Sequence, residues 1–284
     1  MVSPTLGRRP LGEATVLFDG AFTTPRLDHP ESVAVDADGN IWCGGEQGQI
    51  YRLADDTFEL IASTDGFTLG VAFLDPNTLA VCDMARPAVW LLDTSSRSLR
   101  ALPASPPGHQ LLTPNAVVPL PDGSLLVSDS GTPHHPRPGV VRVYLDGRAE
   151  LWFKLPLDFA NGMALSPDLG TVYVAESWSH RVRAIELLPD TWDAGASRIY
   201  AELGDAIPDG LCADEDGALY IGCYEPSQVL RVSTDGTIDV LADDPTAHTL
   251  CHPTGVAVRG EEIVVANLGR WHLSTIARPM RPRD

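Results

Sequence analysis

The sequence PDGLCADEDGALYI, residues 208–221, contains the pattern that decides the fold. A small residue, Gly210, stands inside an apolar run, the polar turn Asp216-Gly217 follows, and a second β-rich run, Leu219–Ile221, comes after it. Short apolar runs separated by Asp, Gly or Pro are typical of antiparallel strands joined by tight turns. This stretch therefore predicts a β-hairpin.

The same pattern occurs six times along the chain. Its small residues are Ser32, Gly70, Ala116, Gly162, Gly210 and Gly255. Their consecutive spacings are 38, 46, 46, 48 and 45 residues. A fixed period of this length indicates an array of equal structural units.

Each unit has room for four strands. After the hairpin of the fifth copy, a third alternating run covers 228–232 and a fourth covers 238–241. No segment shows a convincing helical period, so we predict an all-β fold: a six-bladed β-propeller with four antiparallel strands per blade. An open two-sheet sandwich is the alternative, and six equal periods argue against it.

The chain ends suggest how the ring closes. The sixth copy ends after its third strand near Ile276, whereas a lone strand, Ala14–Phe18, precedes the first copy. We expect this N-terminal strand to complete the last blade and so remove an exposed sheet edge. The prediction is a single propeller domain over 1–284, with tails at 1–13 and 277–284.

Composition excludes several classes of protein. The 284 residues include 20 Lys and Arg against 38 Asp and Glu, a formal net charge of −18, which repels nucleic acids and anionic membranes. No apolar run reaches the roughly 20 residues of a membrane span, and no secretory signal is evident. Five widely spaced cysteines are expected to be reduced. We expect a cytoplasmic protein, a monomer or weak oligomer, with no nucleic-acid or membrane partner.

Chemistry is expected at the start of each inner strand, because inner strands line the central channel of a propeller. The residue before each small residue forms a ring there. This ring is Glu31, Leu69, Asn115, Asn161, Asp209 and Thr254. Two carboxylates and two carboxamides are the ligands that hard divalent cations prefer. The alternative is that Asn and Asp before Gly only favour turns.

These residues also carry a resemblance. In order, His29-Pro30-Glu31, Pro114-Asn115, Asn161-Gly162 and Pro208-Asp209-Gly210 are similar to motifs of the senescence marker protein/gluconolactonase/luciferin-regenerating-enzyme-like family. The resemblance implies one divalent cation held by Glu31, Asn161 and Asp209, with calcium first and zinc, manganese or magnesium as alternatives. It also implies that Asn115 touches the substrate or a metal-bound water, and that Asp209 is the general base or nucleophile.

The function that the resemblance implies is a metal-dependent lactonase that opens a small sugar or aliphatic lactone. The sequence has no Gly-x-Ser-x-Gly motif, so a serine nucleophile is not expected. Two alternatives remain. One is a phosphotriesterase or arylesterase on the same site, and the other is a non-enzymatic propeller that binds a metal or metabolite.

Further candidates lie around the channel mouth. Thr113 stands two residues before Asn115, where sugar-lactone members of the family typically place an Arg, which argues against a gluconate-type substrate. Asp129 ends a second strand, and His134 lies in the Pro-rich loop 130–139 that follows it. We expect Thr113, Asp129 and His134, with Asn115, to contact substrate. The alternative for Asp129 is an ordinary turn residue.

Overall fold

The computed structural model describes residues 9–55 and 57–279. Residues 1–8, 56 and 280–284 are outside this description, so most of each predicted tail is outside it. Within the described residues the chain forms six four-stranded sheets and one short 3-10 helix, η1 (Ser177–Ser179). The predicted six-bladed, four-stranded antiparallel propeller is confirmed.

The blades follow one another in chain order, and each runs from an inner to an outer strand. Blade 1 is β2 (Val33–Val35), β3 (Ile41–Gly44), β4 (Gln49–Ala54) and β5 (Thr57–Ser63). Blade 2 is β6 (Thr68–Asp75), β7 (Thr78–Asp83), β8 (Ala88–Asp93) and β9 (Ser98–Leu102). Blade 3 is β10 (Pro114–Pro119), β11 (Leu125–Asp129), β12 (Arg137–Val143) and β13 (Ala149–Leu157).

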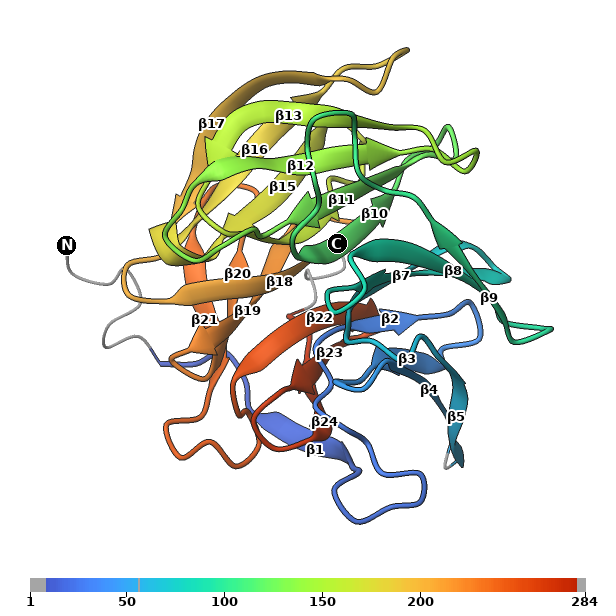
Figure 1. Ribbon diagram of the computed structural model, residues 1–284. Coiled ribbons are helices and arrows are strands. Elements are labelled where there is room, and N and C mark those ends of the chain that lie inside the picture. Colours follow the sequence, from blue (N-terminus) through green and yellow to red (C-terminus); the bar gives the residue numbers. More distant parts are fainter. Residues whose placement is uncertain (1–8, 56, 280–284) are drawn as a thin grey trace.

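The second half of the ring repeats this order. Blade 4 is β14 (Ala160–Leu165), β15 (Thr171–Glu176), β16 (Arg181–Leu187) and β17 (Ala194–Glu202). Blade 5 is β18 (Ile207–Ala213), β19 (Leu219–Glu225), β20 (Gln228–Val232) and β21 (Ile238–Asp243). Blade 6 is β22 (Pro253–Arg259), β23 (Glu262–Asn267), β24 (His272–Ala277) and β1 (Ala14–Asp19). Figure 1 shows inner strands such as β2, β10 and β18 around the centre and outer strands at the edge.

Closure of the ring joins the two ends of the chain. β1 pairs with β24 in antiparallel register, from Ala14↔Ile276 to Asp19↔His272, so the N-terminal strand completes blade 6 as expected. The residues before β1 also contact blade 5. The amides of Leu11 and Gly12 donate 2.9 Å hydrogen bonds to the carbonyls of Val240 and Leu241 on β21. The N-terminal segment therefore holds blades 5 and 6 together.

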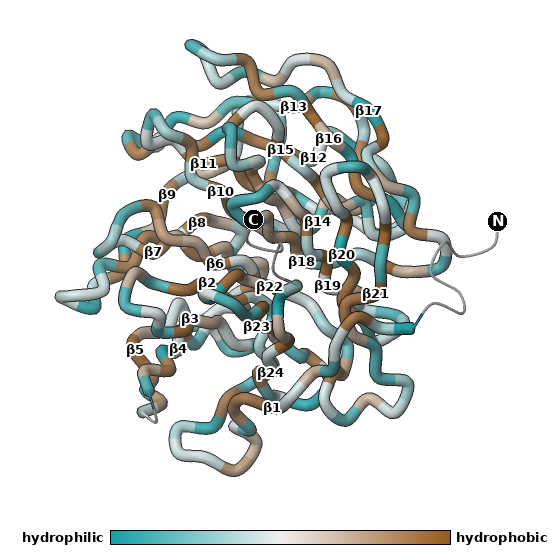
Figure 2. The backbone as a smooth tube through the Cα atoms, turned by 180° about the vertical axis from the view of Figure 1, so that it is seen from behind, coloured by the Kyte–Doolittle hydropathy of each residue, from teal (hydrophilic) through white to brown (hydrophobic). Residues whose placement is uncertain are grey.

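The hydrophobic core lies between blades. Six clusters of buried residues each combine facing strands of two adjoining blades; Leu126 and Trp152 of blade 3, for example, pack with Val172 and Ile185 of blade 4. Alternation along the strands supplies these faces, because successive side chains point to opposite sides of a sheet. Figure 2 shows hydrophobic residues gathered along the strands and hydrophilic ones in the turns. Within the described residues, no helix has the length and apolarity needed to cross a membrane.

Candidate active site

A β-bulge marks the start of the inner strand in blades 2 to 6. In blade 5, Pro208 pairs with Cys223 and Leu211 with Ile221. Between these two pairs the inner strand advances by three residues and its neighbour by two. The same shift occurs at Thr68/Val71, Pro114/Val117, Ala160/Met163 and Pro253/Val256. Bulges of this kind re-aim side chains. Each bulge contains the ring residue and the small residue after it.

The small residues are required by backbone contacts between blades. A Cβ atom added to Gly162 would lie 2.3 Å from the carbonyl oxygen of Asp209, and one added to Gly210 would lie 2.6 Å from that of Thr254. Real Cβ atoms do not approach other atoms so closely. Neighbouring inner strands therefore touch backbone to backbone at the end of the channel where the ring residues lie, which we call the hub. This contact fixes the positions of the ring residues.

Five of the six ring residues line one small cavity at this end of the channel. The cavity has a volume of about 30 Å³, and its walls include Glu31, Leu69, Asn115, Asn161 and Asp209. The sixth ring residue, Thr254, is fully buried. A cavity of this size holds an ion with a water molecule but no substrate ring. A substrate would lie outside it, in the channel mouth.

Two acids share the cavity without a basic partner. Burial, followed by the nearby charges of Asp209 and Glu46, raises the pKa of Glu31 well above its usual value. Burial raises the pKa of Asp209 to about 7, and a hydrogen bond from Asn161 opposes that shift. Among the described residues no Lys, Arg or His forms an ion pair with either carboxylate. Two adjacent acids without a counter-charge favour the binding of a cation.

The two carboxamides are oriented by serines. The side-chain nitrogen of Asn115 donates to Ser130 Oγ at 3.0 Å, and that of Asn161 donates to Ser177 Oγ at 3.2 Å. Each serine in turn donates to a backbone carbonyl of the next blade, Ala160 at 2.8 Å and Pro208 at 2.7 Å. With their NH₂ groups held in this way, both amides keep a carbonyl oxygen as acceptor. The donor set therefore fits a hard divalent cation.

The comparisons with known proteins agree with this architecture. The sequence profile of the SMP-30/Gluconolactonase/LRE-like region matches residues 45–259. The chain belongs to this family. Asn115, Asn161 and Asp209 lie inside the matched residues and Glu31 lies before them. A strictosidine synthase-like N-terminal profile also matches residues 22–53.

Individual relatives match over shorter stretches. Regucalcin of Xenopus laevis is 32% identical over 81 residues, which cover 28% of this chain and 27% of that protein. Lactonase drp35 of Staphylococcus saprophyticus is 38% identical over 84 residues, covering 28% of this chain and 26% of that lactonase. The matches thus span about a quarter of the length of these relatives.

Solved structures of the family share the fold over nearly the whole chain. A gluconolactonase from Xanthomonas campestris superposes with a TM-score of 0.78 at 21% identity, covering 96% of this chain and 91% of its own. A calcium-binding regucalcin from Agrobacterium tumefaciens superposes with a TM-score of 0.71 at 18% identity, covering 90% and 93%. At these identities the likeness establishes the fold.

Three residues predicted to contact substrate do not line the hub cavity of this family member. Asp129 is fully buried, and its carboxylate accepts hydrogen bonds from the amides of Leu112 and Thr113. The Thr113 hydroxyl donates to the carbonyl of Gly131 at 3.2 Å. His134 packs on Trp178 with 4.9 Å between ring centroids. The structure shows that Asp129 fastens the loop before β10, and contact of these residues with substrate stays a prediction.

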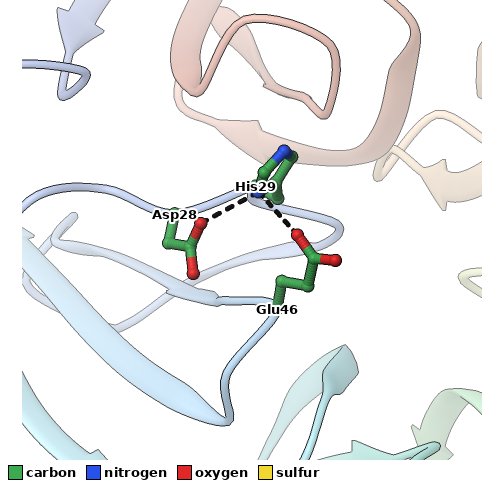
Figure 3. A group of neighbouring side chains, drawn as sticks. All are labelled: Asp28, His29 and Glu46. Atoms are coloured by element: carbon green, nitrogen blue, oxygen red, sulfur yellow. Dashed lines mark hydrogen bonds and ion pairs between the residues drawn. The ribbon is translucent and has the colours of Figure 1, made fainter.

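A second polar cluster lies beside the hub, and sequence patterns gave no sign of it. His29 Nδ1 lies 2.9 Å from Asp28 Oδ1 and 2.8 Å from Glu46 Oε2 (Figure 3). One ligand atom from each of these three side chains lies within 4.8 Å of the others, so the group could also hold a metal ion. The Asp28 carboxylate additionally accepts from Gln47 and Gln49. The other ring nitrogen of His29 points away from both carboxylates (Figure 3).

Proposed function

We propose that this chain is a divalent-metal-dependent lactonase. The ion would be held by Glu31, Asn161 and Asp209, with Asn115 beside it, and the substrate would be a small lactone. The carboxylate and carboxamide oxygens suit calcium first, with zinc, manganese and magnesium as alternatives. Family membership supports hydrolase chemistry, and the similar proteins include a lactonase and a calcium-binding regucalcin.

The observation that carries the proposal is the pair of uncompensated acids in a cavity of about 30 Å³. Glu31 and Asp209 are half-buried, and holding two ionised carboxylates together in such a site is costly unless a positive charge joins them. The protein contributes no such charge from the described residues, yet it does contribute two oriented amide oxygens. A structural role alone would not require this arrangement.

The side chains then have separate tasks. When bound, the cation would polarise the lactone carbonyl and stabilise the negative charge that develops on its oxygen. Asp209 would either remove a proton from the attacking water or attack the carbonyl itself. Asn161 donates to Asp209 and so favours its ionised form. Asn115 is placed to hold the substrate or a water molecule at the mouth of the cavity.

The test combines a metal panel with one conservative variant. Metal-stripped protein is assayed on sugar and aliphatic lactones and on an aryl phosphotriester, alone and with Ca²⁺, Zn²⁺, Mn²⁺ or Mg²⁺. We expect lactone hydrolysis only with metal, and a loss of about 10³-fold in kcat for Asp209→Asn. Asp38→Asn, the same chemical change at an exposed turn of the opposite face, is the matched control.

Each contrary result has a definite meaning. Faster hydrolysis of the phosphotriester than of any lactone would assign the site to the phosphotriesterase alternative. Metal binding without turnover of any ester would indicate a binding propeller. Unchanged turnover in Asp209→Asn would remove Asp209 from the mechanism.

A further inference from the structure

A second layer of side chains lies directly outside the hub. The residues two positions before the ring residues are His29, Phe67, Thr113, Phe159, Ile207 and His252, and all six are half-buried. Because these residues immediately precede the ring and are partly exposed, this layer is expected to border the channel mouth. His29, Phe159 and His252 have φ values of 41°, 61° and 48°. Positive φ values strain the backbone of residues other than glycine, and strain at three equivalent positions favours a functional surface.

Most polar groups of this layer are already in use, and the histidine Nε2 atoms are the exception. None of its members is Arg, Lys, Asp, Glu, Asn or Gln, and the Thr113 hydroxyl donates to Gly131. His29 uses Nδ1 on Asp28 and Glu46, and His252 uses Nδ1 on the carbonyl of Tyr224 at 3.1 Å. A site that recognises a polyhydroxylated sugar needs several free hydrogen-bonding groups at fixed positions. This layer offers mainly apolar and aromatic surface instead.

Blade 5 adds one more aromatic ring near the end of its second strand. Tyr224 follows the alternation of β19: Tyr220 packs in the core between blades 5 and 6, and a Cβ on Gly222 would meet the Thr254 carbonyl oxygen of blade 6. Tyr224 lies on this same side of the sheet, toward blade 6. Ile207 pairs with Glu225 and Pro208 with Cys223, so the second strand has one extra residue at this step.

Tyr224 stacks on His252. Their centroids are 4.5 Å apart with 25° between the planes. Nδ1 of the histidine lies 3.1 Å from the Tyr224 carbonyl oxygen and 3.2 Å from Glu225 Oε1, and its backbone amide donates to Ser227 Oγ at 3.1 Å. Tyr224 is half-buried, so part of it remains open to a ligand. We name this pair, Tyr224 and His252, the aromatic platform.

The aromatic platform borders the hub. Burial and then the charges of Glu31, Glu225 and Asp209 raise the pKa of Tyr224. Tyr224 also lies opposite Ile207 and Pro208, the two residues before Asp209, because these pair with Glu225 and Cys223 on either side of it. A ligand group that reacts at the hub would have its neighbouring atoms against this platform.

We propose that the preferred substrate is a lactone or ester fused or linked to an aromatic ring, and that this ring stacks on Tyr224 and His252. The inference rests on the proposed lactonase function and specifies its substrate class. Offset stacking adds about 0.5–1.5 kcal/mol beyond the burial of apolar surface, which favours an aryl substrate over an otherwise equal saturated one. Hydroxyl groups of a sugar lactone would lose their water against the same surface without gaining partners.

The test compares three six-membered lactones: dihydrocoumarin, δ-valerolactone and glucono-δ-lactone. Because the phenoxide leaving group of dihydrocoumarin raises its kcat/KM over that of δ-valerolactone in any esterase, the contribution of the platform is the part of this ratio that Tyr224→Leu removes. We expect that part to be about two- to tenfold, with glucono-δ-lactone the poorest substrate. Tyr224→Leu should thus lower kcat/KM more for dihydrocoumarin than for δ-valerolactone, and Tyr224→Phe should restore the native ratio. Tyr144→Leu, at the turn between β12 and β13 on the opposite face, is the matched control.

A binding measurement separates this inference from the proposed function. Chroman has the bicyclic aryl ring of dihydrocoumarin without the carbonyl, so its Kd needs no turnover. We expect Tyr224→Leu to weaken chroman binding by about tenfold and Tyr224→Phe to leave it unchanged. Tyr224-dependent chroman binding without hydrolysis would refute the lactonase and retain the aromatic platform. Equal turnover of aryl and sugar lactones, or an equal loss on all three in Tyr224→Leu, would refute the platform and retain the lactonase.

Discussion

The two ends of the central channel are built from the same six strands, yet they differ in chemistry. On one side of the small residues the strands present Glu31, Asn115, Asn161 and Asp209 to a cavity of about 30 Å³. On the other side a cavity of about 430 Å³ is lined by residues such as Val33, Val71, Val117 and Met163. The polar end is narrow and the apolar end is wide.

The difference follows from one structural device. In blades 2 to 6 the bulge at the small residue lets the ring residue face the channel, whereas the residues after it return to regular pairing and strand alternation. A single sequence position per blade therefore controls the chemistry of one end. Substitutions at that position should affect ligand binding and turnover, and substitutions at the small residue should affect folding.

The largest effect is expected when one hub acid is removed. Glu31→Gln halves the negative charge of the cavity and keeps its volume, so affinity for the divalent cation should fall by at least about 100-fold. Titration calorimetry of metal-stripped protein measures this. Val117→Ile at the apolar end is the control and should bind metal normally. Equal affinity in Glu31→Gln and the native protein would place the ion elsewhere.

The anchoring serines provide a graded test. Ser177→Ala releases the amide of Asn161, a proposed ligand, and should weaken metal binding by about tenfold, within the range for residues that orient ligands. Ser130→Ala releases Asn115, which lies beside the ion in our account, and should have a smaller effect. The order is measured in the same titration. If Ser130→Ala weakened metal binding more than Ser177→Ala, Asn115 rather than Asn161 would be the metal ligand.

The small residues should affect stability more than binding. Gly162→Ala places a Cβ 2.3 Å from the Asp209 carbonyl oxygen, so neighbouring backbones must separate. We expect a loss of about 1–3 kcal/mol in the free energy of unfolding, measured by urea denaturation. Gly39→Ala is not a suitable control because its φ is 84°. Gly12→Ala is suitable, since its Cβ would meet atoms only at 3.7 Å or beyond.

The smallest effect is a pH dependence of stability in the metal-free protein. The folded-state pKa values of Glu31 and Asp209 are raised, to about 7 for Asp209, so the native state binds more protons than the unfolded chain between about pH 4 and 7. The Tm should therefore fall as pH rises through this window and level off above it. Saturating cation holds both acids ionised and should remove or reverse the fall.

The pH dependence has its own control. The double variant Glu31→Gln with Asp209→Asn has no titrating group in the cavity, so its Tm should not fall between pH 4 and 7. Acids elsewhere with lowered pKa values, such as Asp36 and Asp122, contribute stability that is lost only below about pH 4. A native-like fall in the double variant would assign the effect to other groups.

Much of this architecture could be predicted from the repeat alone. Spacing and alternation determine how many blades form, and the start of each inner strand falls near the axis by symmetry. The symmetry of the repeat puts Asn115, Asn161 and Asp209 at one end of the channel. It also separates Asp209, at the start of an inner strand, from Asp129, at the end of a second strand, but it could not predict that the Asp129 carboxylate accepts hydrogen bonds from the amides before β10.

Features that depend on contacts between blades could not be predicted. Ser130 and Ser177 are ordinary residues after a strand until their hydroxyls meet the next blade. Alternation along β19 predicts which blade Tyr224 faces, but its stacking on His252 depends on a contact between blades. For the two serines the sequence offers one signal: in blades 3 and 4, whose ring residue is Asn, an acid followed by Ser stands at the end of the second strand.

The most direct measurement of the central claim is the position of a bound ion. Crystals soaked in Mn²⁺ would be examined by anomalous scattering, which locates the metal independently of activity. Our account predicts one strong peak within about 2.1–2.6 Å of oxygen atoms of Glu31, Asn161 and Asp209. A peak only at Asp28, His29 and Glu46, or no peak at the hub at saturating Mn²⁺, would contradict it.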